Sequence, residues 1–438
     1  MKRVLLTAVA LLAVSSWSTM AFGQLEFERA PIRYSETEPN DAVAKLMRQV
    51  ESGEVSLNYD LRHGYLADLL RELNVPISSQ TLVFSKTSLQ IRRISPAKPR
   101  ALYFNDDIYV GWVQDGDVIE LSAVDPVLGP VFYTLSQKDR GRASLARDQG
   151  HCLTCHASSR TQGVPGFVMR SVFPDRSGQP HYGSGTYTLD QTTPFERRWG
   201  GWYVTGSHGD MRHLGNAVSA EEMLSKEEIE AGANVCDLSP LFDVTPYLTD
   251  TSDVVALMVL EHQTQMHNFL TLANFESRIA LDYNTVMAKA LDRPEDELSE
   301  STQRRIASVG EKLIKHLLFV DEFSLTSPVK GNSTFAEDFQ ALGSRDSQGR
   351  SLRDLDLQTR LFKYPCSFLI LNESFKQLPK PVLTYVMTRL TGILQGTDES
   401  GEFDHLTPAD RMAIREILQQ EIPELMDTKT VTVNSDVD

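Results

Sequence analysis

The chain has 438 residues, of which 41% are hydrophobic and 23% are charged. This length and composition suit two or three packed domains and exclude a collagen-like or disordered chain. The formal net charge of −16 argues against partners that need a positive surface, such as nucleic acid or anionic membranes, whereas a basic redox partner would be attracted.

The first 23 residues have the organisation of a secretory signal peptide. Lys2 and Arg3 precede an apolar run over residues 4–14, and a small, polar stretch with Ala21 and Gly23 leads to a cleavage point. The apolar run is too short to span a bilayer, and no cysteine follows the cleavage point to carry a lipid. We therefore expect an exported, periplasmic protein with no transmembrane anchor.

Residues 24–139 are predicted to hold two helices followed by an antiparallel β meander. Helical periodicity begins near Asn40 and recurs over residues 64–73, where leucines share one side. The next runs are short, alternate in polarity and are separated by turn sequences, a hairpin pattern. The expected strands are residues 82–84, 89–91, 101–104, 108–113, 118–124 and 131–135.

A single C-x-x-C-H motif follows residues 140–149, which we expect to form a short polar helix. It consists of Cys152, Cys155 and His156, and this spacing is the attachment signature of c-type haem. Two thiols on one turn can form thioethers with the two haem vinyl groups, and the adjacent imidazole binds the iron as its proximal ligand. In bacteria this attachment takes place outside the inner membrane, where the predicted signal peptide would deliver the chain.

Three other interpretations of these cysteines stay open. A thioredoxin-like redox pair would require a βαβ context, and a zinc site would require further Cys or His ligands at metal-binding spacing. A disulfide between Cys152 and Cys155 would leave His156 without a role. The two remaining cysteines, Cys236 and Cys366, are either a disulfide or two free thiols.

One loop contains the candidates for a second, distal iron ligand. Met211 stands between His208 and His213, and each of the three side chains can coordinate iron, methionine giving the higher reduction potential. The alternative for each is an ordinary loop residue, and an open iron site is also possible. Pro165 is placed to offer its carbonyl to the outer nitrogen of His156, or else it is a simple turn proline.

From residue 219 onward the sequence is mainly helical. Asp253 is expected to cap a long helix reaching at least residue 279, and Thr407 a helix over residues 408–420; other helices are expected at residues 301–320, 354–362 and 381–394. The long helix carries a polar cluster whose spacing matches no metal motif. The cluster consists of Glu261, His262, Met266 and His267. We expect these side chains to pack or hydrogen-bond at a helix interface; the alternative is that they line the haem pocket.

Arginines near the motif are candidates for pairing with haem propionates, because guanidinium binds carboxylate through two parallel hydrogen bonds. The sequence does not choose among them. They are Arg142, Arg147, Arg160, Arg170, Arg197, Arg198 and Arg212.

Several segments together resemble a group of uncharacterised exported bacterial proteins, of planctomycete type, that carry a single cytochrome c domain with one C-x-x-C-H. They are residues 150–159 (GHCLTCHASS), 163–166 (GVPG), 198–206 (RWGGWYVTG), 213–216 (HLGN) and 362–366 (FKYPC). The resemblance covers most of the mature chain. It implies covalent haem binding and electron transfer, with no established substrate.

We therefore predict an α+β protein, with an antiparallel β-rich N-terminal and central region around an atypical cytochrome c-like haem site and a helical C-terminal region. The expected parts are a signal peptide (1–23), helices and meander (24–139), a haem-binding region (140–250), a helical domain (251–426) and a frayed tail (427–438). The predicted function is that of a periplasmic monohaem c-type cytochrome that transfers electrons to a redox partner. The alternatives are a peroxidase-like haem enzyme or small-molecule sensor with an open distal iron site, and a docking module of a larger complex.

Overall fold

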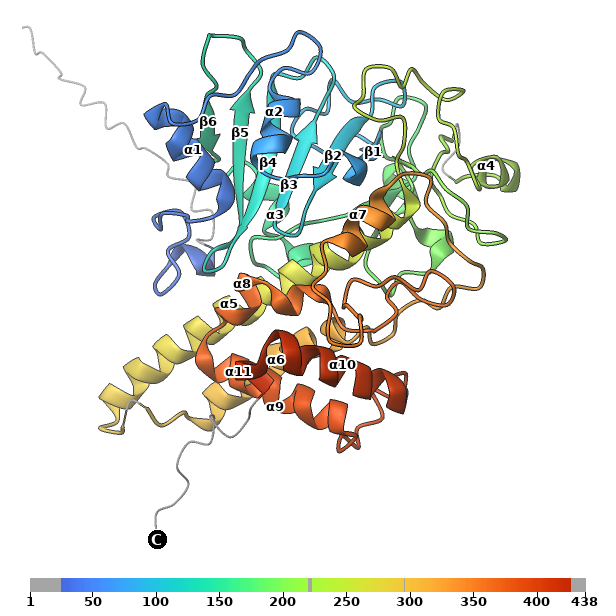
Figure 1. Cartoon of the computed structure of the whole chain (residues 1–438). Helices are drawn as coiled ribbons and strands as arrows, with labels where there is room; N and C mark the ends of the chain where they lie inside the picture. Colours follow the sequence, from blue (N-terminus) through green and yellow to red (C-terminus); the bar gives the residue numbers. More distant parts are fainter. Residues whose placement is uncertain (1–24, 220–222, 295, 427–438) are drawn as a thin grey trace, which may run out of the picture.

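The computed structural model describes residues 25–219, 223–294 and 296–426. The predicted signal peptide and C-terminal tail lie outside these residues. The expectation of an α+β chain is confirmed: an antiparallel sheet occupies the N-terminal half, and the C-terminal part is helical (Figure 1). The longest helix, α5, extends from the sheet into the cluster of C-terminal helices.

The main sheet has seven strands in the order β6-β5-β4-β3-β2-β1-β9, with antiparallel pairing between neighbours. Strands β1 to β6 follow one another as a meander, and the chain returns after the C-x-x-C-H segment to add β9 beside β1. A separate pair is formed by β7 and β8. The bounds are β1 Thr81–Val83, β2 Arg100–Phe104, β3 Ile108–Trp112, β4 Val118–Asp125, β5 Gly129–Ser136, β6 Leu145–Arg147, β7 Arg170–Val172, β8 Thr186–Thr188 and β9 Trp202–Tyr203.

The helices begin with the two that the sequence predicts before the sheet. Asp41 caps α1 by accepting the N–H groups of Val43 and Ala44, and Asp253 and Thr407 cap α5 and α10 as expected. The bounds are α1 Ala42–Ser52, α2 Leu66–Glu72, α3 Leu153–His156, α4 Lys226–Ala231, α5 Val254–Ala290, α6 Glu300–Leu317, α7 Phe335–Ala341, α8 Glu373–Lys376, α9 Lys380–Gln395, α10 Pro408–Glu421 and α11 Pro423–Met426.

Two predictions in the N-terminal half are wrong. Residues 140–149 contain no helix: they contain β6, where Leu145 is buried and Ala146 exposed, the alternation of an edge strand paired with β5. Residues 89–91 form turns instead of a strand, with Leu89 and Ile91 largely exposed. The side chain of Gln90 there accepts the N–H of Asp117, so it joins the turn between β3 and β4.

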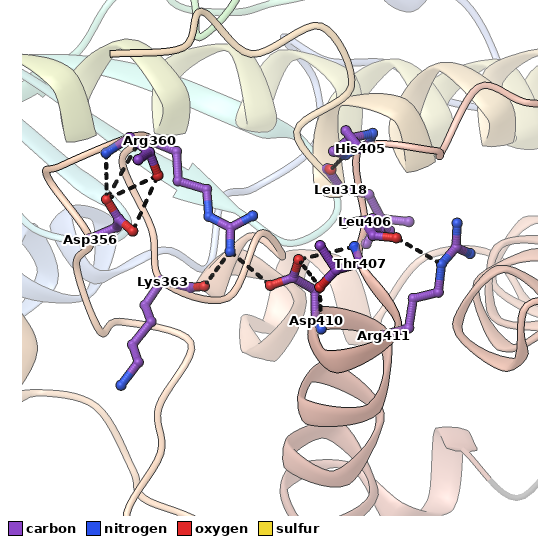
Figure 2. A network of polar contacts seen from close by, with 10 residues as sticks. Leu318, Asp356, Arg360, Lys363, His405, Leu406, Thr407, Asp410 and Arg411 are labelled. Carbon is purple, nitrogen blue, oxygen red and sulfur yellow. Dashed lines mark hydrogen bonds and ion pairs between the residues drawn. The ribbon is translucent and has the colours of Figure 1, made fainter. Parts of the chain in front are cut away.

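The predicted helix at residues 354–362 is also absent. The Asp356 carboxylate accepts the N–H groups of Gln358 and Thr359 and turns the chain back, which is how Asp competes with helix formation. Figure 2 shows how this turn is attached: Arg360 donates to Asp410 at the start of α10, 2.7 Å away. A network of side chains thereby fixes α10 against the turn.

Candidate functional site

The C-x-x-C-H segment forms a single tight turn. The N–H of His156 donates to the carbonyl of Cys152, and α3 covers Leu153–His156. Before the turn, the carboxylate of Asp148 accepts the N–H groups of Gly150 and Cys152 at 2.9 Å. These bonds hold the backbone so that both thiols and the imidazole reach the same cavity.

The cavity has a volume of about 450 Å³, within the range of roughly 300–1,000 Å³ that is usual for ligand pockets. Its floor is one face of the main sheet, and Leu260 and Thr264 of α5 close one side. Cross-strand pairing arranges the side chains of the floor in two rows. One row is Leu102, Gly111, Glu120 and Thr134, and the other is Phe104, Tyr109, Ser122 and Phe132. All of these residues except Phe104 line the cavity.

An ion pair lies across this floor. Arg100 precedes Leu102 by two residues and so shares its face, and its guanidinium lies 2.7 Å from the Glu120 carboxylate. Gly111 makes room for it, because a Cβ there would meet the guanidinium at 2.3 Å. Neither residue belongs to a sequence motif. The signal that the sequence offers is a charged side chain within each of two otherwise largely apolar strands.

His156 is held by the loop that follows it. Its Nδ1 lies 2.8 Å from the carbonyl oxygen of Gly166, and its ring packs against Phe132 with centroids 4.8 Å apart. The carbonyl belongs to Gly166 and not to Pro165, so the predicted partner of the imidazole is wrong by one residue. Burial lowers the pKa of His156, which leaves the imidazole in the neutral form that binds metals.

The loop carrying Gly166 is anchored to α5. The amide of Asn268 accepts the N–H of Phe167 at 2.7 Å and donates to its carbonyl at 2.8 Å. The backbone of Gly166 passes so close that a Cβ would lie 2.4 Å from the Asn268 oxygen. This close approach requires glycine, and it places the carbonyl of Gly166 against the imidazole.

Neither thiol of the motif forms a disulfide. All four cysteines are free: Cys155 and Cys236 are exposed, Cys152 is half-buried and Cys366 is buried. Burial, with the charges of Asp148 and Glu120, raises the pKa of Cys152 to about 12. A reactive redox pair needs a lowered thiol pKa, so the environment of Cys152 does not suit thioredoxin-like chemistry.

The three candidates for the distal ligand lie elsewhere. Met211, His208 and His213 do not line the cavity that Cys152, Cys155 and His156 share. Met211 is buried, and the rings of His208 and His213 pack beside Phe195, 4.8 Å from each other. Nδ1 of His208 bonds to the carbonyl of Met211, and its Nε2 accepts the N–H of Asn234.

The polar cluster of α5 is used inside the fold, as expected for a helix interface. Glu261 pairs with Arg198 at 2.9 Å, His262 contacts Gln191 and Ser367, and His267 contacts the carbonyl of Asp106. Met266 is fully buried, and none of the four lines the cavity.

Among the candidate arginines, only Arg170 lines the cavity. Its Nε donates to the Thr186 hydroxyl, and it forms no ion pair within the described residues. Arg198 and Arg212 pair with Glu261 and Glu230. Burial and the charge of Arg160 lower the pKa of Arg170, which indicates an uncompensated cation beside the cavity. Lys86 and the paired Arg100 are the other cations in the lining.

Within residues 25–426, leaving aside the gaps at 220–222 and 295, no three His, Cys, Asp or Glu side chains are grouped to hold a metal ion. In the same part of the chain, no helix has the length and apolar character required to cross a membrane. Comparison with protein-family models, curated proteins and solved structures gives no match.

Proposed function

We propose that this protein is an exported, periplasmic c-type cytochrome with one covalently attached haem c, and that it transfers electrons. The observation that carries the proposal is that Cys152, Cys155 and His156 line one cavity of ligand-binding size. Two thiols and an imidazole on one turn are the groups that c-type attachment requires. The N-terminal segment, with its short basic region and apolar run, supports export.

The surroundings of the motif fit this group. Burial favours the protonated thiol of Cys152, and Cys152 and Cys155 would hold the haem by adding S–H across its two vinyl double bonds, an addition that consumes no oxidant. Nδ1 of His156 faces the Gly166 carbonyl, which can only accept. Nδ1 therefore carries the proton, and Nε2 keeps the lone pair that binds iron.

When bound, the haem would supply a one-electron couple. The remaining work falls to the chain. Phe132 and Phe167 exclude water from the imidazole side of the cavity, and Asn268 fixes the loop that orients His156. Arg170 and Lys86 are placed to pair with the haem carboxylates. An acidic exterior would favour a basic redox partner.

A second candidate function is a haem enzyme or small-molecule sensor with an open iron position. The observation in its favour is the Arg100–Glu120 pair on the cavity floor, because such a pair can polarise a small ligand or move a proton. The electron carrier is the first candidate because the charges of Arg100 and Glu120 are engaged with each other.

The test is a visible spectrum of the mature protein, ferric and ferrous, with a pyridine haemochrome after denaturation. The protein should be made in a host competent in cytochrome c maturation. A c-type haemochrome with a low-spin ferric spectrum supports the electron carrier, and a high-spin spectrum that shifts with cyanide or carbon monoxide supports the enzyme or sensor. Colourless protein from that host would refute haem binding.

A further inference from the structure

We propose that Met169 is the second axial ligand of the haem iron; this inference rests on the proposed haem site. Met169 lines the cavity together with Cys152, Cys155 and His156. It is 3% exposed, so its thioether is in the dry interior and not in the solvent. Thioether sulfur binds haem iron without first losing a proton.

The backbone around Met169 is fixed at both ends. Asn268 holds Phe167 through two hydrogen bonds on one side. On the other side the carbonyl of Met169 accepts the N–H of Leu189, and β7 begins at the next residue and pairs with β8. A ligand held in this way is positioned before the metal arrives, which is what a stable iron–sulfur bond requires.

Other side chains of the lining that could bind iron are engaged or poorly placed. The Tyr109 hydroxyl accepts a hydrogen bond from Gln263, and Glu120 is paired with Arg100. His151 is 79% exposed and directly precedes Cys152, on the same turn as the proximal ligand. Lys86 would have to lose a proton before it could coordinate.

The loop that the sequence favoured does not supply this ligand in the described structure. Met211, His208 and His213 lie outside the cavity lining. Both ring nitrogens of His208 are already hydrogen-bonded, and Nδ1 of His213 accepts the N–H of Gly215. Bringing either histidine to the iron would require its ring to leave its contact with Phe195.

The experiment compares the wild-type protein with Met169→Leu and Met211→Leu, two substitutions of nearly equal volume at buried methionines. Covalent haem is first quantified by the pyridine haemochrome, and the ferric sulfur-to-iron charge-transfer band in the near infrared is then recorded. We expect the band in wild type and in Met211→Leu, and its complete loss in Met169→Leu together with a lower reduction potential.

Each outcome decides one question. Covalent haem without the band in wild type, or a band that survives Met169→Leu, overturns the assignment of Met169 and leaves the haem proposal standing. Absence of haem from the wild type overturns both. If Met169→Leu does not fold, Met169→His serves in its place: it should keep a low-spin ferric spectrum and lose the sulfur band, and retention of the band would overturn the assignment.

Discussion

Nδ1 of His156 and the carbonyl oxygen of Gly166 lie 2.8 Å apart, and the N–H of Gly166 donates to the carbonyl of His156 over the same distance. The two residues therefore hold each other through both backbone and side chain. This double link fixes the direction of the imidazole before any ligand is bound. It also ties the orientation of His156 to Asn268, which anchors the loop on α5.

Removing the motif thiols should remove covalent haem in steps. Cys152→Ala and Cys155→Ala each delete one of two attachment points, so each should reduce the haem that survives denaturation, and the double variant should retain none. Haem-stained denaturing gels and the pyridine haemochrome measure this. Cys236→Ala is the matched control, because this thiol is exposed and lies outside the cavity. Full retention of haem in the double variant would refute covalent attachment.

Asn268→Ala should loosen the loop that orients His156. It leaves the N–H and carbonyl of Phe167 without partners, at a cost of about 1–3 kcal/mol in unfolding free energy. Asn274→Ala on the same helix is the control, since Asn274 bonds to the carbonyl of Pro126, away from the cavity. Both variants should lower stability, but only Asn268→Ala should alter the ferric spectrum; identical spectral changes in both would contradict this role.

The sequence predicted the sheet well because its strands alternate and are consecutive. Strands β2 to β5 pair with their neighbours along the chain, so local pattern and turn signals were enough. Strand β6 and the turn at residues 354–362 were mispredicted because their conformations depend on contacts that the local pattern does not reveal. For β6 that contact is the edge of β5, and in the turn it is the side chain of Asp356.

The site could be predicted only where its residues are adjacent in sequence. Cys152, Cys155 and His156 carry a local motif. Met169 carries none and reaches the cavity beside β7, which pairs with β8, and Arg170 is one of seven candidate arginines among which the sequence does not choose. The sequence offered Met211, His208 and His213 as distal candidates because each side chain can coordinate iron and all three stand in one loop. These three side chains lie outside the lining of the cavity that contains the motif, which local sequence could not reveal.

Arg170→Gln should lower the reduction potential of the bound haem. A cation beside the cavity opposes the extra positive charge of ferric iron, so its removal stabilises the ferric form. A partly exposed charge contributes about 0.2–1 kcal/mol, equivalent to roughly 10–40 mV for one electron. Redox titration measures the shift. Arg278→Gln is the control: Arg278 is also partly buried and donates to the backbone carbonyls of Val127 and Pro31, outside the cavity. An equal shift in both variants would assign the effect to net charge alone.

Glu261→Gln should change stability in a pH-dependent way. Burial raises the pKa of Glu261 to about 8, against the opposing charge of Arg198. A carboxyl whose pKa is raised on folding contributes its full stabilisation when the pH is below its unfolded pKa of about 4.3. This contribution to the unfolding free energy is lost as the pH rises towards 8. The amide of glutamine does not titrate, so the variant does not lose stability in this way. The variant should therefore become more stable relative to wild type as the pH rises from 5 to 8, as measured by denaturant unfolding.

Glu311→Gln is the matched control with the opposite sign. Burial acts to raise the pKa of Glu311, but hydrogen bonds from Arg389 and Tyr385 outweigh it and lower the pKa. This carboxylate contributes stability above its unfolded pKa, and the contribution is lost as the pH falls through the lowered folded value. Glu311→Gln should thus be destabilising at neutral pH and nearly neutral in acid. If the stability of both variants followed the same pH trend, the opposite pKa shifts assigned to Glu261 and Glu311 would be contradicted.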